Sequence, residues 1–145
     1  MASSNPSSTN VVMLVDDSLD LLEVFSSALR KLGMFTVICA SNGDEALEQA
    51  SYMHLDCMVI DIMMPRLNGF QLIKALRGDP KTRDIPLVIL TALVSNKEHF
   101  ISLASSAEYC LIKPVTPMEL IEAIYRAIAL SKGGSVRRYP TITDE

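Results

Sequence analysis

The chain has 145 residues, 49% of them apolar and 21% charged, which is enough for one domain with a buried core. Its 13 basic and 17 acidic side chains give a formal net charge of -4, which argues against a protein that wraps nucleic acid or lies on an anionic membrane. The three cysteines form no C-x-x-C pair, and the sequence has neither the features of a secretory signal nor a run of about 18 apolar residues. We therefore expect a cytoplasmic protein without a disulfide framework or a zinc site.

Composition divides the chain into three parts. Residues 1–9 are rich in Ser, Asn and Thr, which predicts a flexible N-terminal tail. Residues 10–131 carry the apolar runs and are predicted to form a single domain. Residues 132–145 contain a Gly-Gly pair and Pro140, which end helices, so we expect a C-terminal tail or linker.

Five short apolar runs alternate with helical stretches in the middle part. The runs are continuous rather than alternating, which is typical of parallel strands covered on both faces. They occupy residues 11–15, 35–40, 57–60, 87–90 and 109–112. Five repeats of strand and helix predict an α/β fold in which a parallel sheet lies between two layers of helices.

Capping residues mark the ends of the predicted helices. Ser18 begins the first helix and Gly33 ends it. Its apolar stripe is Leu22, Phe25, Leu29 and Leu32. Three further helices are expected at residues 43–51, 69–77 and 96–105, the last with a capping pair in Ser95 and Glu98. The sequence Thr116-Pro117-Met118-Glu119 opens a final helix that extends to about Leu130.

Polar side chains follow four of the five predicted strands at the point where each strand ends. They are Asp16, Asp17, Asp61, Thr91 and Lys113. Because ligands of such sheets bind beyond the carboxyl ends of the strands, we expect these side chains to meet at one edge. Each residue alone has an ordinary interpretation as a helix cap or a surface group, and the prediction depends on the five together.

Three carboxylates at one edge need a cation. Two unit charges 4 Å apart repel by about 4 kcal/mol at an effective dielectric constant of ~20, and Lys113 neutralises only one of the acids. Hard oxygen ligands favour Mg²⁺, with Mn²⁺ as an alternative. A carboxylate beside such an ion can attack phosphorus, and Asp61 is the preferred nucleophile. Lys113 and the Thr91 hydroxyl are then expected to contact the phosphoryl oxygens.

The ordered set of motifs resembles the receiver domain of two-component response regulators over about residues 10–131. The set consists of Asp16-Asp17, Asp61 within DIMMP, Asn68-Gly69, Thr91-Ala92 and Lys113-Pro114. The resemblance implies a flavodoxin-like (βα)5 fold with a parallel sheet of strand order 2-1-3-4-5. It also implies that the Lys113–Pro114 peptide bond is cis, an isomer found at ~5–6% of X-Pro bonds.

The family further implies transfer of a phosphoryl group from a histidine kinase or phosphotransfer protein to Asp61. Asp17 and Asp61 would bind Mg²⁺ directly, Asp16 largely through water, and the backbone carbonyl of Met63 would complete the protein ligands. Such a domain is a signalling phosphoacceptor rather than a turnover enzyme. An aspartate-nucleophile phosphatase is disfavoured because Met63 stands where those enzymes carry a second Asp.

Relatives use the surface of their fourth helix, fifth strand and fifth helix to bind downstream proteins. The same surface is expected here, and the sequence leaves open whether the chain forms a homodimer through it. The sequence also leaves open whether the chain acts alone or is a fragment of a longer regulator. A receiver-like interaction module that works without phosphorylation is the alternative function.

The sequence departs from the family at two structural positions. Cys110 stands where relatives carry Tyr or Phe, with an aromatic residue one position earlier at Tyr109, and this questions the usual switching mechanism. Ser106 replaces the usual Gly before the fifth strand. Met63 and Leu93 occupy the two positions that tune phosphoryl lifetime in the family. Because neither side chain can orient a water molecule, they predict slow loss of the phosphoryl group.

Overall fold

The computed structural model describes residues 9–62, 69–91 and 105–133, with side chains described as far as Ser131. Five parallel strands form one sheet, in the order β2-β1-β3-β4-β5. The strands are β1 (Val11–Val15), β2 (Thr36–Ala40), β3 (Cys57–Asp61), β4 (Leu87–Thr91) and β5 (Tyr109–Ile112). Each lies within one residue of its predicted position, and the order confirms the flavodoxin-like sheet.

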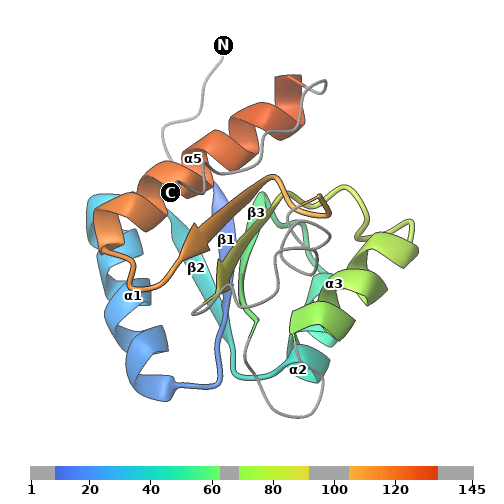
Figure 1. Cartoon of the computed structure of the whole chain (residues 1–145), viewed down its shortest axis with the longest axis horizontal. Coiled ribbons are helices and arrows are strands. Elements are labelled where there is room, and N and C mark those ends of the chain that lie inside the picture. Colours follow the sequence, from blue (N-terminus) through green and yellow to red (C-terminus); the bar gives the residue numbers. More distant parts are fainter. Residues whose placement is uncertain (1–8, 63–68, 92–104, 134–145) are drawn as a thin grey trace.

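Helices cover both faces of the sheet (Figure 1). One face carries α1 (Leu19–Leu32) and α5 (Pro117–Gly133), and the other carries α2 (Gly43–Ala50) and α3 (Gly69–Gly78). The helix predicted at 96–105 lies almost wholly outside the described residues, as does most of both predicted tails. In the part of the chain that the structure describes, no helix is long and apolar enough to cross a bilayer.

The apolar runs serve two hydrophobic cores at once. Met13 and Val15 of β1 pack on the side of α2 and α3, whereas Val12 and Leu14 pack on the side of α1 and α5. Successive side chains of a strand point to opposite faces, so a strand between two helical layers needs apolar residues at every position. This explains why the runs are continuous rather than alternating.

The first helix begins and ends as predicted, with one difference. Its cap Ser18 accepts a hydrogen bond through Oγ from the Leu21 N–H at 3.2 Å, and Gly33 is the C-cap. The left-handed residue of this turn, however, is Met34, with φ of 61°, whereas Gly33 has an ordinary φ of -92°. The N–H of Phe35 then donates to the Leu29 carbonyl at 3.2 Å, which completes the turn.

The prediction that Leu32 belongs to the buried stripe of this helix is wrong. Leu22 and Leu29 are buried, but Leu32 is 61% exposed. At 100° per residue, Leu32 lies about 80° from Leu22 around the helix axis, beyond the other members of the stripe. It is also the last residue of α1.

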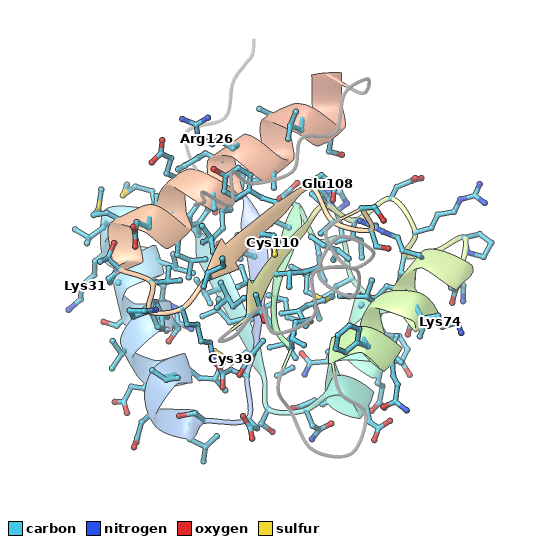
Figure 2. All side chains as sticks on the ribbon, viewed as in Figure 1. Lys31, Cys39, Lys74, Glu108, Cys110 and Arg126 are labelled. Atoms are coloured by element: carbon cyan, nitrogen blue, oxygen red, sulfur yellow. The ribbon has the colours of Figure 1, made fainter. Side chains whose placement is uncertain are left out.

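The last helix confirms its predicted capping box. The Thr116 N–H donates to Glu119 Oε1 at 2.8 Å, and the Glu119 N–H donates to Thr116 Oγ1 at 3.1 Å. The helix extends to Gly133, three residues beyond the predicted end at Leu130. Arg126 lies on its outer surface, where it pairs with Glu122 (Figure 2).

Two arginines on the helices donate hydrogen bonds to backbone carbonyls in or next to the strands. Arg77, at the end of α3, donates through Nε to the Ser106 carbonyl at 2.9 Å and pairs with Glu108 at 3.0 Å. Glu108 is buried just before β5, and its Oε1 also accepts the Leu87 N–H at 2.8 Å. Arg30 of α1 donates to the carbonyl of Val37, on the edge strand β2, at 3.1 Å.

Candidate functional site

Three of the predicted acids meet at the carboxyl edge of the sheet. Strands β1 and β3 are neighbours, and their register pairs Val15 with Ile60, so the residues that follow them lie side by side. Carboxylate oxygens of Asp16, Asp17 and Asp61 all lie within 4.8 Å of one another. Asp16 and Asp61 are buried, whereas Asp17 is exposed. The cluster therefore has two inner acids and one acid facing solvent.

Lys113 reaches this cluster from the far edge strand. Its Nζ lies 3.1 Å from Asp61 Oδ1, and the side chains are 28% and 5% exposed, respectively. The Lys113 N–H donates to the Thr91 carbonyl at 2.8 Å, which ties the end of β5 to the end of β4. Thr91 is buried at that end, as predicted. The cis Lys113–Pro114 peptide bond that the resemblance implied is also present.

The electrostatics of Asp16 agree with the expected repulsion. Its pKa is raised, first by burial and then by the neighbouring charges of Asp61 and Asp17. The Ser18 N–H, which donates to Asp16 Oδ1 at 2.9 Å, and the Lys113 ammonium oppose this rise. Burial and like charges prevail, so a cation beside the cluster would favour the ionised form of Asp16.

A glycine allows the backbone to fold closely behind the site. The Gly69 N–H donates to the carbonyl of Ile62, the residue after Asp61, at 3.2 Å. A Cβ added at Gly69 would lie 2.6 Å from the Ile62 Cα, closer than such atoms approach in proteins. Gly69 is thus required at this position for a reason of space. Asn68 lies outside the described residues.

The donor set suits a small, hard divalent ion. Carboxylate oxygens from three residues converge, the surplus charge is negative, and one of the three acids faces solvent, where metal-bound water could remain. The residues therefore fit Mg²⁺, and the chemistry of the donors fits Mn²⁺ as well. Of the predicted site residues and tuning positions, Met63 and Leu93 lie outside the described residues.

Cys110 is packed as a core side chain. It is 1% exposed on the α2 and α3 side of β5, and burial raises its pKa to about 12 (Figure 2). Tyr109 packs on the opposite face, beside α5. The expectation that the two neighbours face opposite ways is confirmed, so Tyr109 does not occupy the space of the usual aromatic residue.

Sequence reasoning missed an apolar wall beside the acids. Leu21 and Phe25 of α1 and Val115, after β5, line a cavity of about 400 Å³ that also touches Asp16 and Lys113. Leu21 immediately precedes the buried stripe residue Leu22, and its position next to the stripe was the available signal. Its position across the cavity from a segment more than 90 residues away is not encoded in any local pattern.

Comparison with known proteins places these features in a family context. A family model described as the response regulator receiver domain matches residues 12–125. The transcriptional regulatory protein CpxR of Escherichia coli is 36% identical over 119 residues, covering 82% of this chain and 49% of that protein. The probable transcriptional regulator ycf27 of Guillardia theta is 35% identical over 117 residues, covering 81% and 44%. The chain spans about half the length of these curated relatives.

Solved structures of similar proteins match nearly over their full length. The chemotaxis protein CheY4 of Vibrio cholerae has a TM-score of 0.74 at 30% identity, covering 83% of this chain and 99% of that one. The receiver domain of the Francisella response regulator 1452 has a TM-score of 0.74 at 30% identity, covering 83% and 98%.

Proposed function

The chain belongs to the response regulator receiver domain family of two-component systems, and from this premise we propose that it accepts a phosphoryl group on Asp61. The observation that carries the proposal is the geometry of Asp61. Its buried carboxylate lies 3.1 Å from the Lys113 ammonium and within 4.8 Å of two further acids. A charged nucleophile with a fixed cation beside it is what phosphoryl transfer requires of a protein.

In the proposed step, a carboxylate oxygen of Asp61 bonds to the phosphorus of a phosphohistidine. The P–N bond breaks, and the imidazole leaves with the bonding pair and takes up a proton. Lys113 stays beside the reacting carboxylate and balances charge on the phosphoryl oxygens, and the Thr91 hydroxyl contacts another oxygen. The product is an acyl phosphate on the protein itself, so the chain would act as a phosphoacceptor and not as a turnover enzyme.

The acids of the cluster have a second role in this proposal. Asp17 and Asp61 would hold Mg²⁺ or Mn²⁺, with Asp16 acting largely through water and the Met63 backbone carbonyl as a further ligand. The bound ion would supply the positive charge that three carboxylates and a phosphoryl group together require.

The partners follow from the family. We propose a histidine kinase or phosphotransfer protein as donor, and a downstream protein that binds the surface formed by the fourth helix, β5 and α5, in the cytoplasm. CpxR and ycf27 are named as transcriptional regulators and are about twice as long as the matched region. A chain of this kind can work alone, as a homodimer or joined to an output domain.

Phosphorylation can be tested directly with a small donor. Incubation with acetyl phosphate and Mg²⁺ should produce a retarded band on a phosphate-affinity gel and a mass gain of one phosphoryl group. EDTA or Asp61→Asn should abolish both signals. Asp20→Asn, which changes an acid in the first turn of α1 outside the cluster, is the matched control and should label normally. Labelling of the Asp61→Asn protein would contradict the proposal.

A receiver-like module that binds partners without phosphorylation is the second candidate. It is favoured by buried Cys110, which stands in the place of the family's aromatic residue. One experiment distinguishes the two functions. It compares the affinity for a partner protein with and without the phosphoryl analogue beryllofluoride. Equal affinity in the two states would support the second candidate.

A further inference from the structure

A cavity of about 400 Å³ is lined by residues of α1 and of the connection from β5 to α5. Leu21 and Phe25 form its wall on the helix side, and Pro114 and Val115 form the opposite wall. A smaller void of about 20 Å³ is also lined by Leu21 and Phe25. The side chains of Leu21 and Phe25 therefore lie between the larger cavity and this smaller void.

The cavity shares two lining residues with the proposed phosphoacceptor site. Asp16 and Lys113 line it, and the same two residues contact or neighbour Asp61 in the acid cluster. A ligand can thus present a phosphoryl group to Asp61 while another part of it occupies the cavity. The volume falls within the ~300–1,000 Å³ typical of small-molecule sites.

The lining identifies the chemistry of the ligand. Leu21 is 38% exposed, and the walls away from Asp16 and Lys113 are apolar, so covering them removes apolar surface from water. Among the described residues that line the cavity, the polar ones are Asp16 and Lys113, which lie beside Asp61. A ligand that matches this arrangement has an anionic phosphoryl end and an apolar body.

We propose that the cavity binds the apolar acyl group of an acyl phosphate, and that Asp61 takes the phosphoryl group of branched or aromatic acyl phosphates in preference to acetyl phosphate. The inference rests on the proposed function and adds a class of small-molecule donor to it. In the step, an Asp61 oxygen bonds to phosphorus and the bond from phosphorus to the acyl oxygen breaks. The bonding pair leaves with the acyl carboxylate, so no oxidant and no further proton is required.

The test compares benzoyl phosphate with acetyl phosphate as donors to the whole chain in Mg²⁺ buffer. Initial labelling rates are measured against donor concentration on a phosphate-affinity gel. The half-saturating concentration should be about tenfold lower for benzoyl phosphate, which corresponds to about 1.4 kcal/mol of binding. Benzylphosphonate cannot transfer its phosphorus, so it should compete with benzoyl phosphate and shift the methyl NMR signals of Leu21 and Val115.

Two variants on the same helix separate the cavity from the surface. Leu21→Gln removes an apolar wall without adding charge, and should raise the half-saturating concentration for benzoyl phosphate about threefold more than that for acetyl phosphate. Val24→Gln is the matched control, because Val24 is 57% exposed on α1 and does not line the cavity. Val24→Gln should leave the half-saturating concentrations of both donors unchanged.

Three results would overturn the inference while leaving the proposed function intact. They are equal half-saturation by the two donors, equal effects of Leu21→Gln and Val24→Gln, and absence of benzylphosphonate shifts at the cavity methyls. If Leu21→Gln slowed transfer only from a phosphorylated histidine phosphotransfer protein, the cavity would receive a protein side chain and the inference would also fail. Failure of both donors to label Asp61 would instead refute the proposed function.

Discussion

The ammonium of Lys113 lies 3.1 Å from Oδ1 of Asp61, although the two residues stand at the ends of β5 and β3 with β4 between them. The contact closes the acid cluster on the side away from Asp16 and Asp17. The Asp61 side chain is 5% exposed, so little water surrounds its carboxylate and the Lys113 ammonium is a charged partner close to it.

Replacing Lys113 should therefore destabilise the metal-free protein. Lys113→Met should lower the free energy of unfolding by about 1–3 kcal/mol, since it leaves a buried carboxylate without its cation. The measurement is urea unfolding in EDTA. Lys31→Met, at an exposed lysine in the last turn of α1, is the control and should change stability little (Figure 2). If Lys113→Met lowered the free energy of unfolding equally in the Asp61→Asn protein, the ion pair would not be the cause.

Asp16 should make the metal-free protein less stable as pH rises. Its pKa is higher in the folded state than in the unfolded chain, so the folded state binds more protons between the two values. Stability from this group is therefore greatest below about pH 3.9 and falls as pH rises through the raised pKa. Above that pKa, Asp16→Asn should be more stable than the wild type, on the order of 1 kcal/mol.

Thermal unfolding of both proteins in EDTA between pH 4 and pH 8 would measure this difference. Asn keeps an oxygen that can accept the Ser18 N–H, so the comparison isolates the charge. Asp20→Asn is the control for loss of an exposed acid on the neighbouring helix. The prediction would be contradicted if the melting temperatures of the wild type and of Asp16→Asn changed with pH in parallel across this range.

Gly69→Ala should destabilise the protein by about 1–3 kcal/mol, because its Cβ would meet backbone that cannot move without displacing Ile62. Ile62 follows Asp61, so the rate of labelling by acetyl phosphate should also fall. Gly78→Ala in the same helix is the matched control, since a Cβ there meets nothing within 4 Å. Urea unfolding and gel labelling measure the two effects, and equal behaviour of the two variants would refute the steric argument.

Met34→Gly should stabilise the protein by up to about 1 kcal/mol. Met34 is exposed and has a left-handed φ of 61°, a conformation that costs residues with a Cβ but not glycine. Met34→Ala keeps the Cβ and should show no such gain. Thermal unfolding distinguishes them, and a gain shared by both variants would point to the removal of an exposed apolar chain instead.

Arg77→Met should lower the free energy of unfolding by about 3 kcal/mol, because Glu108 would remain buried without its cation. The change also removes the donors to the Ser106 and Ile85 carbonyls. Arg126→Met breaks an exposed ion pair and should change stability by less than about 1 kcal/mol. Urea unfolding compares the two arginines, and similar costs would show that burial of the pair is not decisive.

The strands and the polar edge could be predicted because local signals determine them. Continuous apolar runs identify buried parallel strands, and the carboxyl ends of such strands meet at one edge, which brings Asp16, Asp61 and Lys113 together. Helix starts were equally clear, since Ser18 and Thr116 make the capping bonds that their sequence context predicts.

The features that sequence reasoning missed depend on contacts between distant segments. Leu32 is exposed at the last position of α1, and Met34 rather than Gly33 takes the left-handed conformation. The cavity exists because Val115 faces Leu21 across a separation that no periodicity encodes. The buried pair of Arg77 and Glu108 likewise joins residues that look like ordinary surface charges in the sequence.

The hydrogen bond from Arg30 to the Val37 carbonyl affects whether a strand of another molecule can pair with the edge strand β2. The Thr36 N–H and the Ala40 carbonyl bond toward β1, so the intervening residues Val37 and Cys39 direct their backbone groups outward from the sheet. A guanidinium group occupies one of those outward carbonyls. A strand of another molecule would have to displace the Arg30 guanidinium in order to pair with β2. The contact therefore protects the protein against polymerisation by strand addition.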